Sequence, residues 1–176
     1  MTYTGVKKPN NRIIAAGNPL VQELSIETAT EMYPGRLVKR GTADSDIVVN
    51  TAGGKAIGWL GYEQTNPVYR PDDVDSIYEK DTFAAVLNGG KFYPVASLAS
   101  GESVNKGDPL VGTANGQVKA ASDLAVSSGS DTASAVDGTT PALEGSVLPE
   151  GPIVAYAEES VDASGGAADI IVRSVI

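Results

Sequence analysis

Residues 32–64 read MYPGRLVKRGTADSDIVVNTAGGKAIGWLGYEQ, and this stretch decides the fold class. Pro34-Gly35 predicts a corner that leads into a short strand centred on Leu37 and Val38. The β-branched run Ile47–Val49 predicts a second strand. Gly53-Gly54 predicts a turn, because paired glycines supply the positive φ angles of tight turns, and a third strand follows through Trp59. The stretch is therefore typical of short strands joined by turns.

The same pattern continues on both sides of this stretch. Asn88-Gly89-Gly90 predicts a hairpin between strands near 82–87 and 91–96, and Asn115-Gly116 predicts a second hairpin. Residues 20–26 fit a strand or one helical turn, whereas 153–157 and 169–175 fit the final strands. With 20 glycines, 10 prolines and only 6% aromatic residues, the composition favours many turns. We predict an all-β fold, a small β-barrel or sandwich.

The chain divides into an N-terminal arm, residues 1–18, and a single β domain, residues 19–176. The arm is polar apart from Ile13–Ala16, so it fits either a frayed terminus or an extended arm that adds a strand to a partner. Within the β domain, residues 122–152 consist mainly of Ser, Ala, Gly, Thr and Asp. They predict a long flexible loop or flap, because few of them could bury apolar area.

The formal net charge of −9 and the sequence pI of about 4.4 argue against direct binding to nucleic acid. Phosphate contacts need clustered Lys and Arg, and this chain has only isolated basic pairs. No segment reaches the ~20 consecutive apolar residues that a membrane span requires, so we expect no membrane partner. No signal-peptide pattern follows the N-terminus. Acidity of this degree is also compatible with a salt-loving host.

The sequence contains neither cysteine nor histidine. This composition excludes thiol nucleophiles, His-based catalytic triads and His- or Cys-ligated zinc. Asp72, Asp73, Asp75 and Glu79 could attract a calcium ion, but they lack the turn glycine and distal glutamate of a calcium loop. A solvated acidic loop fits them better. We therefore expect no enzyme activity and no cofactor.

Trp59 is the only tryptophan in the chain. It fits either a core plug or an anchor at a protein interface, a position that tryptophan often occupies. Tyr62, three residues later, is the second candidate anchor.

The segments PGRLV (34–38), GKAIGWLGYEQ (54–64), DTFAAVLNGGKFYPVA (81–96) and VNKGDPLVGTANGQVKAA (104–121) follow one another in an order that resembles the small capsid decoration, or cement, proteins of tailed viruses. The closing phrase IVAYAEESVDASGGAADIIVRSVI (153–176) is similar to the ending of that group. The lambda head decoration protein is its familiar structural example. The resemblance implies a β-tulip-like core.

The resemblance further implies a homotrimer at the three-fold and quasi-three-fold positions of an HK97-type capsid. The trimer would bind the major capsid protein on the outer surface of the virion, after synthesis in the host cytoplasm. A protein that binds only the expanded shell stabilises that state by mass action, and trimerisation adds avidity. The candidate capsid contacts lie in the arm: Thr2, Tyr3, Thr4, Val6, Lys7, Lys8, Arg12, Ile13 and Ile14.

Three other classes of protein stay open. A tail, fibre-base or receptor-binding module of the virion could share the same β pattern. A trimeric nucleotide hydrolase that uses Asp and a bound Mg²⁺ would show a dense polar motif near the trimer seam, and no such motif can be identified in this sequence. A cell-surface adhesion module fits less well without a signal peptide.

Overall fold

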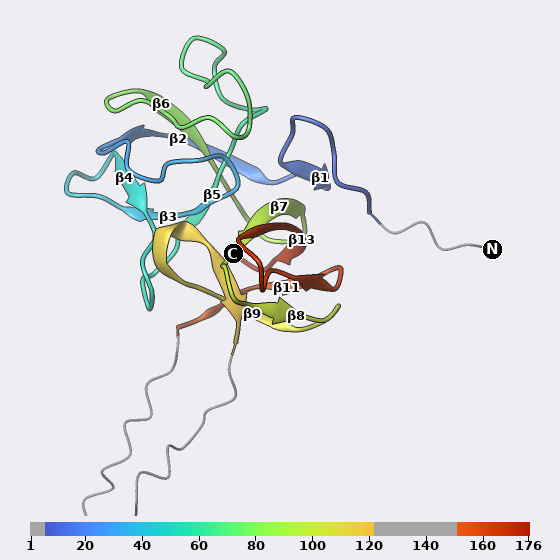
Figure 1. Cartoon of the computed structure of the whole chain (residues 1–176). Helices are drawn as coiled ribbons and strands as arrows, with labels where there is room; N and C mark the ends of the chain where they lie inside the picture. Colours follow the sequence, from blue (N-terminus) through green and yellow to red (C-terminus); the bar gives the residue numbers. More distant parts are fainter. Residues whose placement is uncertain (1–5, 122–150) are drawn as a thin grey trace, which may run out of the picture.

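The computed structural model describes residues 6–121 and 151–176, and regular structure in these ranges consists of strands and one short 3₁₀ turn, η1 (Ala114–Gly116). The strands build two small barrels that lie side by side (Figure 1). In chain order the strands are β1 (Ile14–Ala16), β2 (Leu20–Ile26), β3 (Leu37–Arg40), β4 (Asp46–Val49), β5 (Gly58–Leu60), β6 (Phe83–Asn88), β7 (Tyr93–Leu98), β8 (Ser103–Val104), β9 (Pro109–Gly112), β10 (Val118–Ala120), β11 (Ile153–Ala157), β12 (Val161–Asp162) and β13 (Ala168–Ser174). The predicted all-β fold class is confirmed.

The first barrel is the closed ring β2-β4-β3-β5-β6. Only β2 and β4 run parallel in it. Successive side chains of a strand point to opposite faces, so alternate residues fill the interior. The interior side chains are Leu24, Ile26, Met32, Val38, Ile47, Leu60, Tyr78, Ala84 and Val86.

The second barrel is built from the C-terminal half of the chain. Its strands follow the order β7-β10-β9-β11-β13, and a further pairing of β7 with β13 closes the ring. β1 adds to the beginning of β7, and β8 and β12 form a separate two-stranded sheet. The arm is thereby joined to the second barrel while β2, which follows it, starts the first.

The two barrels share one apolar seam. Leu60 and Val86 point into the first barrel, whereas their neighbours Trp59 and Leu87 point outward and join the core cluster of the second barrel. Both faces of β5 and β6 are therefore buried, which explains why these strands are apolar without alternation. The Trp59 indole Nε1 donates a hydrogen bond of 3.0 Å to the Ser174 hydroxyl of β13, in the buried seam.

The hairpin predicted at Asn115-Gly116 is confirmed, because β9 and β10 pair antiparallel across it. The hairpin predicted at Asn88-Gly89-Gly90 is wrong. Both glycines have positive φ, 94° and 64°, so the chain does turn there. However, β2 and β5 already occupy the two edges of β6, and the Gly90 N–H donates to the Ile176 carbonyl. The turn carries the chain from one barrel to the other.

The predicted flexible loop, 122–152, falls mainly on residues 122–150, outside the described residues. Within the described ranges, no helix has the length and apolar character to cross a bilayer.

Candidate functional site

The N-terminal arm lies along the junction of the two barrels from residue 6 onward. Its last residues form β1, in which Ile14 pairs with Pro94 and Ala16 with Tyr93 of β7. The Ile13 side chain is only 3% exposed and belongs to the core cluster of the seam. Residues 13–16 are thus part of the chain's own fold.

Polar contacts hold the arm at three further points. The Glu63 carboxylate Oε1 accepts the backbone N–H groups of Ile13, at 3.1 Å, and Ile14, at 2.8 Å. Asn11 Oδ1 accepts the Val74 N–H at 3.1 Å. Lys8 forms an ion pair of 3.3 Å with Glu159 and donates to the backbone carbonyl of Asp169. These contacts join the arm to the β5–β6 connection and to the second barrel.

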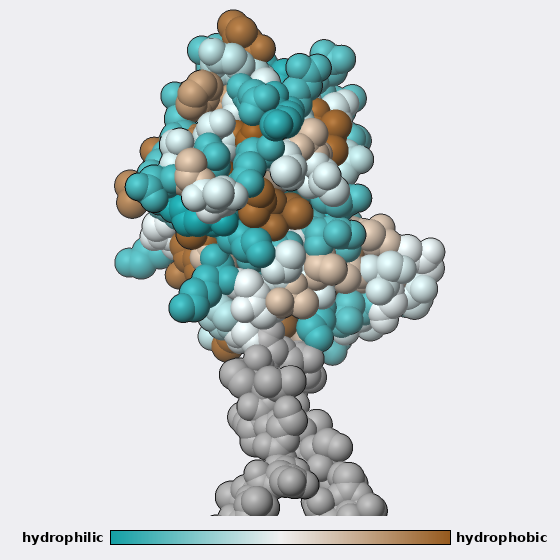
Figure 2. Space-filling model, turned by 90° about the vertical axis from the view of Figure 1, so that its left-hand side faces the viewer, coloured by the Kyte–Doolittle hydropathy of each residue, from teal (hydrophilic) through white to brown (hydrophobic). Residues whose placement is uncertain are grey.

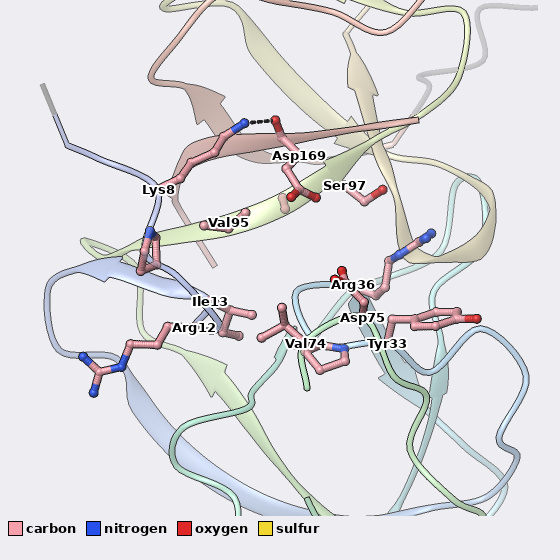
Figure 3. Close-up of a pocket in the computed structure, with 13 residues that line it drawn as sticks. Lys8, Arg12, Ile13, Tyr33, Arg36, Val74, Asp75, Val95, Ser97 and Asp169 are labelled. Atoms are coloured by element: carbon pink, nitrogen blue, oxygen red, sulfur yellow. Dashed lines mark hydrogen bonds between the residues drawn. The ribbon is translucent and has the colours of Figure 1, made fainter. Parts of the chain in front are cut away.

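A groove of about 260 Å³ lies beneath the arm, between it and the two barrels (Figure 3). Ile13, Val74 and Val95 provide apolar walls, and the charged side chains come from both barrels and the arm. Figure 3 shows Lys8 reaching toward Asp169 at one end of the groove, whereas Arg36 and Tyr33 lie at the other. The full lining is Lys8, Pro9, Arg12, Ile13, Tyr33, Pro34, Arg36, Val74, Asp75, Val95, Ala96, Ser97 and Asp169.

Arg36 is the half-buried cation of this groove. Its guanidinium donates to the Asn115 carbonyl at 2.8 Å and lies 5.6 Å from the centre of the Tyr33 ring. Burial lowers the pKa of Arg36, and the nearby Glu31 opposes this effect in part. Within the described residues Arg36 forms no ion pair. A groove of this kind can bind a polar or anionic group.

The predicted arm contacts fall into four groups, of which Ile13 and Ile14, discussed below, are the last. Val6, Lys7 and Arg12 are exposed, and Figure 3 shows Arg12 pointing away from the groove. Lys8 is exposed but bonded to the body of the chain. Thr2, Tyr3 and Thr4 lie outside the described residues.

Ile13 and Ile14 were both expected to contact a partner. Ile13 requires a correction, because its side chain is only 3% exposed and packs in the seam. Ile14 pairs with Pro94 of β7 through its backbone, but its side chain is only partly buried, so it stays a candidate contact.

Trp59 and Tyr62 also lie inside the molecule. The Trp59 side chain is fully buried, and Tyr62 is 5% exposed. The Tyr62 hydroxyl donates to the Asp72 carbonyl at 3.1 Å, and the Arg70 guanidinium stacks 4.9 Å above its ring. Trp59 thus packs in the core, and neither ring is exposed to a partner.

One carboxylate of the acidic loop takes part in a turn. The Asp73 carboxylate accepts hydrogen bonds from the Asp75 N–H and the Ser76 hydroxyl, as is typical of turns that begin with Asp. Within residues 6–121 and 151–176, no group of three or more Asp or Glu side chains is arranged to hold a metal ion.

Sequence reasoning did not identify Glu63, Asn11 or Arg36. The hydrogen bonds of these residues to Ile13, Val74 and Asn115 each bridge 50 or more positions, and nothing in the local sequence marks them. The one available signal was a charged residue directly beside a predicted buried strand, as Glu63 is beside Trp59–Tyr62 and Arg36 beside Leu37.

Residues 2–171 match the protein family described as XM1 gp53 minor capsid protein. No curated protein gives a significant match. Among solved structures, the fold is similar to the head fiber gp8.5 N base of bacteriophage phi29, with a TM-score of 0.46 and 11% identity over 88% of this chain and 92% of that chain. A likeness that distant carries no conclusion about function.

Proposed function

Because the chain belongs to the XM1 gp53 minor capsid protein family, we propose that it decorates the outer surface of a phage capsid. It would bind the major capsid protein as a homotrimer at three-fold and quasi-three-fold positions. Membership of the family makes the chain a structural component of the phage virion, and the proposed role involves no catalysis. The observation that carries the proposal is the extent of the match, residues 2–171, which includes the arm and almost all of both barrels.

The surface charge supports a place outside the shell. A net charge of −9 would repel the negatively charged packaged DNA. It therefore suits a position outside the shell, where the shell separates the protein from the DNA. A trimer offers the shell three identical contacts, and each contact can be weak because the linked sites bind with avidity. Extra binding energy to the expanded shell then stabilises that state by mass action.

Residues 2–7 are the proposed first contact with the shell. Residues 8–16 are anchored to the body of the chain. Val6, Lys7 and Arg12 are exposed. A short extended segment can bind a partner through backbone hydrogen bonds with little demand on sequence.

Copy number and assembly state test the proposal together. We expect about one copy of the chain per major capsid protein in purified virions, by calibrated gel densitometry, since three-fold decoration matches subunit number. We expect sedimentation equilibrium to give three times the chain mass of 18.0 kDa. A handful of copies per particle would contradict shell-wide decoration and point to a tail or vertex position instead.

The contribution of the arm is tested in the same system. Deleting residues 2–7 leaves the Lys8 and Glu63 contacts in place and should weaken binding to shells that lack the protein. The matched control is Lys55→Glu, an exposed cation on the β4–β5 turn, far in sequence from the arm. Binding of the truncated chain equal to that of the full chain would remove the arm from the proposed interface.

A further inference from the structure

The connection between β5 and β6, residues 61–82, is much longer than its place in the fold requires. The two strands are antiparallel neighbours, with Trp59 opposite Leu87 and Leu60 opposite Val86. Hairpin loops usually need about 2–5 residues, and loops beyond about 12–15 residues are commonly functional. This connection spans 22 residues and forms the top of the molecule in Figure 1.

Specific hydrogen bonds order the connection. Asn66 Oδ1 accepts the Val68 N–H at 3.1 Å, and the Asn66 carbonyl accepts the Tyr69 N–H at 2.9 Å, so residues 66–70 form a tight turn. The Tyr62 hydroxyl joins the two halves of the connection by donating to the Asp72 carbonyl. The Tyr78 side chain packs in the core of the first barrel, and Thr65 accepts the Ala85 N–H of β6, so the connection is fixed to that barrel. An ordered loop loses little conformational entropy when a partner binds.

An apolar cluster, defined here as Val68, Tyr69 and Phe83, combines two residues of the turn with the first residue of β6. These side chains are 81%, 36% and 44% exposed, and the Tyr69 and Phe83 rings lie 5.7 Å apart at 60°. Figure 2 shows hydrophobic residues at the same upper end of the molecule, surrounded by hydrophilic ones. Adjacent aromatic and aliphatic side chains left exposed on an ordered loop are typical of a binding surface.

The connection that carries this cluster is acidic. Residues 70–82 carry five exposed carboxylates against the two cations Arg70 and Lys80: Asp72, Asp73, Asp75, Glu79 and Asp81. Asp81 forms an ion pair with the neighbouring Lys80, at 4.0 Å. An exposed apolar cluster on an acidic loop is complementary to a protein surface that has an apolar centre and a Lys- or Arg-rich rim.

We propose that the β5–β6 connection is a second docking surface, which binds a basic-rimmed apolar patch on the major capsid protein. This inference rests on the proposed function. The apolar cluster supplies most of the binding energy, whereas the carboxylates orient the partner and make association sensitive to salt. The connection and the arm would then hold the shell at two separated points.

Shells purified from a phage that lacks this protein provide the probe. The purified full-length chain is titrated onto them and the bound fraction is measured by cosedimentation. Val68→Ser/Phe83→Ser should weaken binding by about tenfold or more, because it removes exposed apolar area from the centre of the interface. Asp72→Lys/Glu79→Lys should weaken binding similarly and reduce its dependence on salt. Both residues are exposed, and the internal hydrogen bonds to their backbone carbonyls do not depend on the side chains.

Two matched variants serve as controls. Leu20→Ser removes a 68% exposed leucine from β2, and Glu23→Lys/Asp44→Lys reverses two exposed carboxylates elsewhere on the first barrel. Both should bind like the wild type. All variants are first compared with the wild type by thermal unfolding, and those within a few degrees are used.

The outcomes separate the two proposals. Wild-type chain that fails to bind the shells overturns the proposed function, and this inference with it. Wild-type binding that the two connection variants retain overturns this inference alone. Loss of binding together with dissociation of the trimer in sedimentation also overturns it, because the connection would then be a contact between copies of this chain.

Discussion

The hydroxyl of Tyr78 is a middle link in a buried hydrogen-bond chain that closes the first barrel where the β5–β6 connection leaves it. The hydroxyl donates to the Gly61 carbonyl at 2.7 Å, so the Thr65 hydroxyl, 3.0 Å away, donates to Tyr78 in turn. The Ala85 N–H completes the chain by donating to Thr65 at 3.1 Å. A single phenol near the end of the connection therefore satisfies two groups near its start.

Replacing Tyr78 by phenylalanine tests this role through the pH dependence of stability. Tyr78→Phe should lower the free energy of unfolding at neutral pH by about 1–3 kcal/mol, because Gly61 and Thr65 lose a buried partner. Burial raises the pKa of Tyr78 to about 12. In the unfolded chain the phenol ionises near pH 10, so the wild type loses stability as the pH rises from about 10 to 12. The gap between wild type and Tyr78→Phe should therefore narrow in that window.

Urea denaturation at neutral pH and at steps between about pH 9 and 12 measures this gap. Tyr33→Phe is the control, since the Tyr33 hydroxyl makes no hydrogen bond within the described residues. A gap that stays constant up to pH 12 would show that Tyr78 is not the titrating group.

At the scale of elements, we expect the Glu63 carboxylate to hold β1 against β7 through its hydrogen bonds to the Ile13 and Ile14 N–H groups. Glu63→Ala removes the acceptor of two backbone N–H groups, so residues 13–16 should exchange their amide hydrogens faster and the chain should lose about 1.5–3 kcal/mol of stability. Glu63→Gln keeps one oxygen acceptor and should show a smaller effect. Hydrogen exchange followed by mass spectrometry measures the exchange rates of residues 13–16 in each variant. Peptides from β7 are measured in the same experiment for comparison.

Gln64→Ala is the matched control for the Glu63 variants, because the Gln64 side chain is exposed and makes no hydrogen bond within the described part of the chain. Unchanged protection of residues 13–16 in Glu63→Ala would mean that Ile13 packing alone holds the arm.

The elements also show which parts of the fold could be predicted. Local signals were sufficient for the strands around Leu37 and Val38 and for the hairpin at Asn115-Gly116, because alternation and turn chemistry act over a few residues. The turn at Asn88-Gly89-Gly90 gave the same local signal but joins two barrels. A turn residue fixes where the chain reverses, whereas the free strand edges decide which partner it meets.

The candidate site was less predictable than the fold for the same reason. Composition identified the exposed Lys7 and Arg12, since charged residues of a polar segment face solvent in most contexts. It could not show that Ile13 is covered, because the residues that cover it and the carboxylate that holds it come from distant strands. Trp59 illustrates the same limit, as its large ring fits a core and an interface equally well until its neighbours are known.

For the whole molecule, the shared seam should make the two barrels unfold as one unit. Trp59 and Leu87 belong to strands of the first barrel but pack in the core of the second, and Ser174 accepts the Trp59 N–H across the seam. Opening the first barrel would therefore remove side chains from the core of the second, and opening the second would expose the apolar outer face of β5 and β6. Leu87→Ala should cost about 2–5 kcal/mol and should keep a single calorimetric transition, with equal calorimetric and van't Hoff enthalpies.

Calorimetry at one fixed protein concentration checks this prediction, since a trimer would make the unfolding temperature depend on concentration. Leu20→Ala is the control and should change stability by no more than about 0.5 kcal/mol, because Leu20 is 68% exposed on the far end of β2. If Leu87→Ala instead splits the transition in two, the barrels are separate folding units. Cooperative unfolding matters for a shell protein, because a load applied at the arm or at the β5–β6 connection is then resisted by the stability of the whole chain.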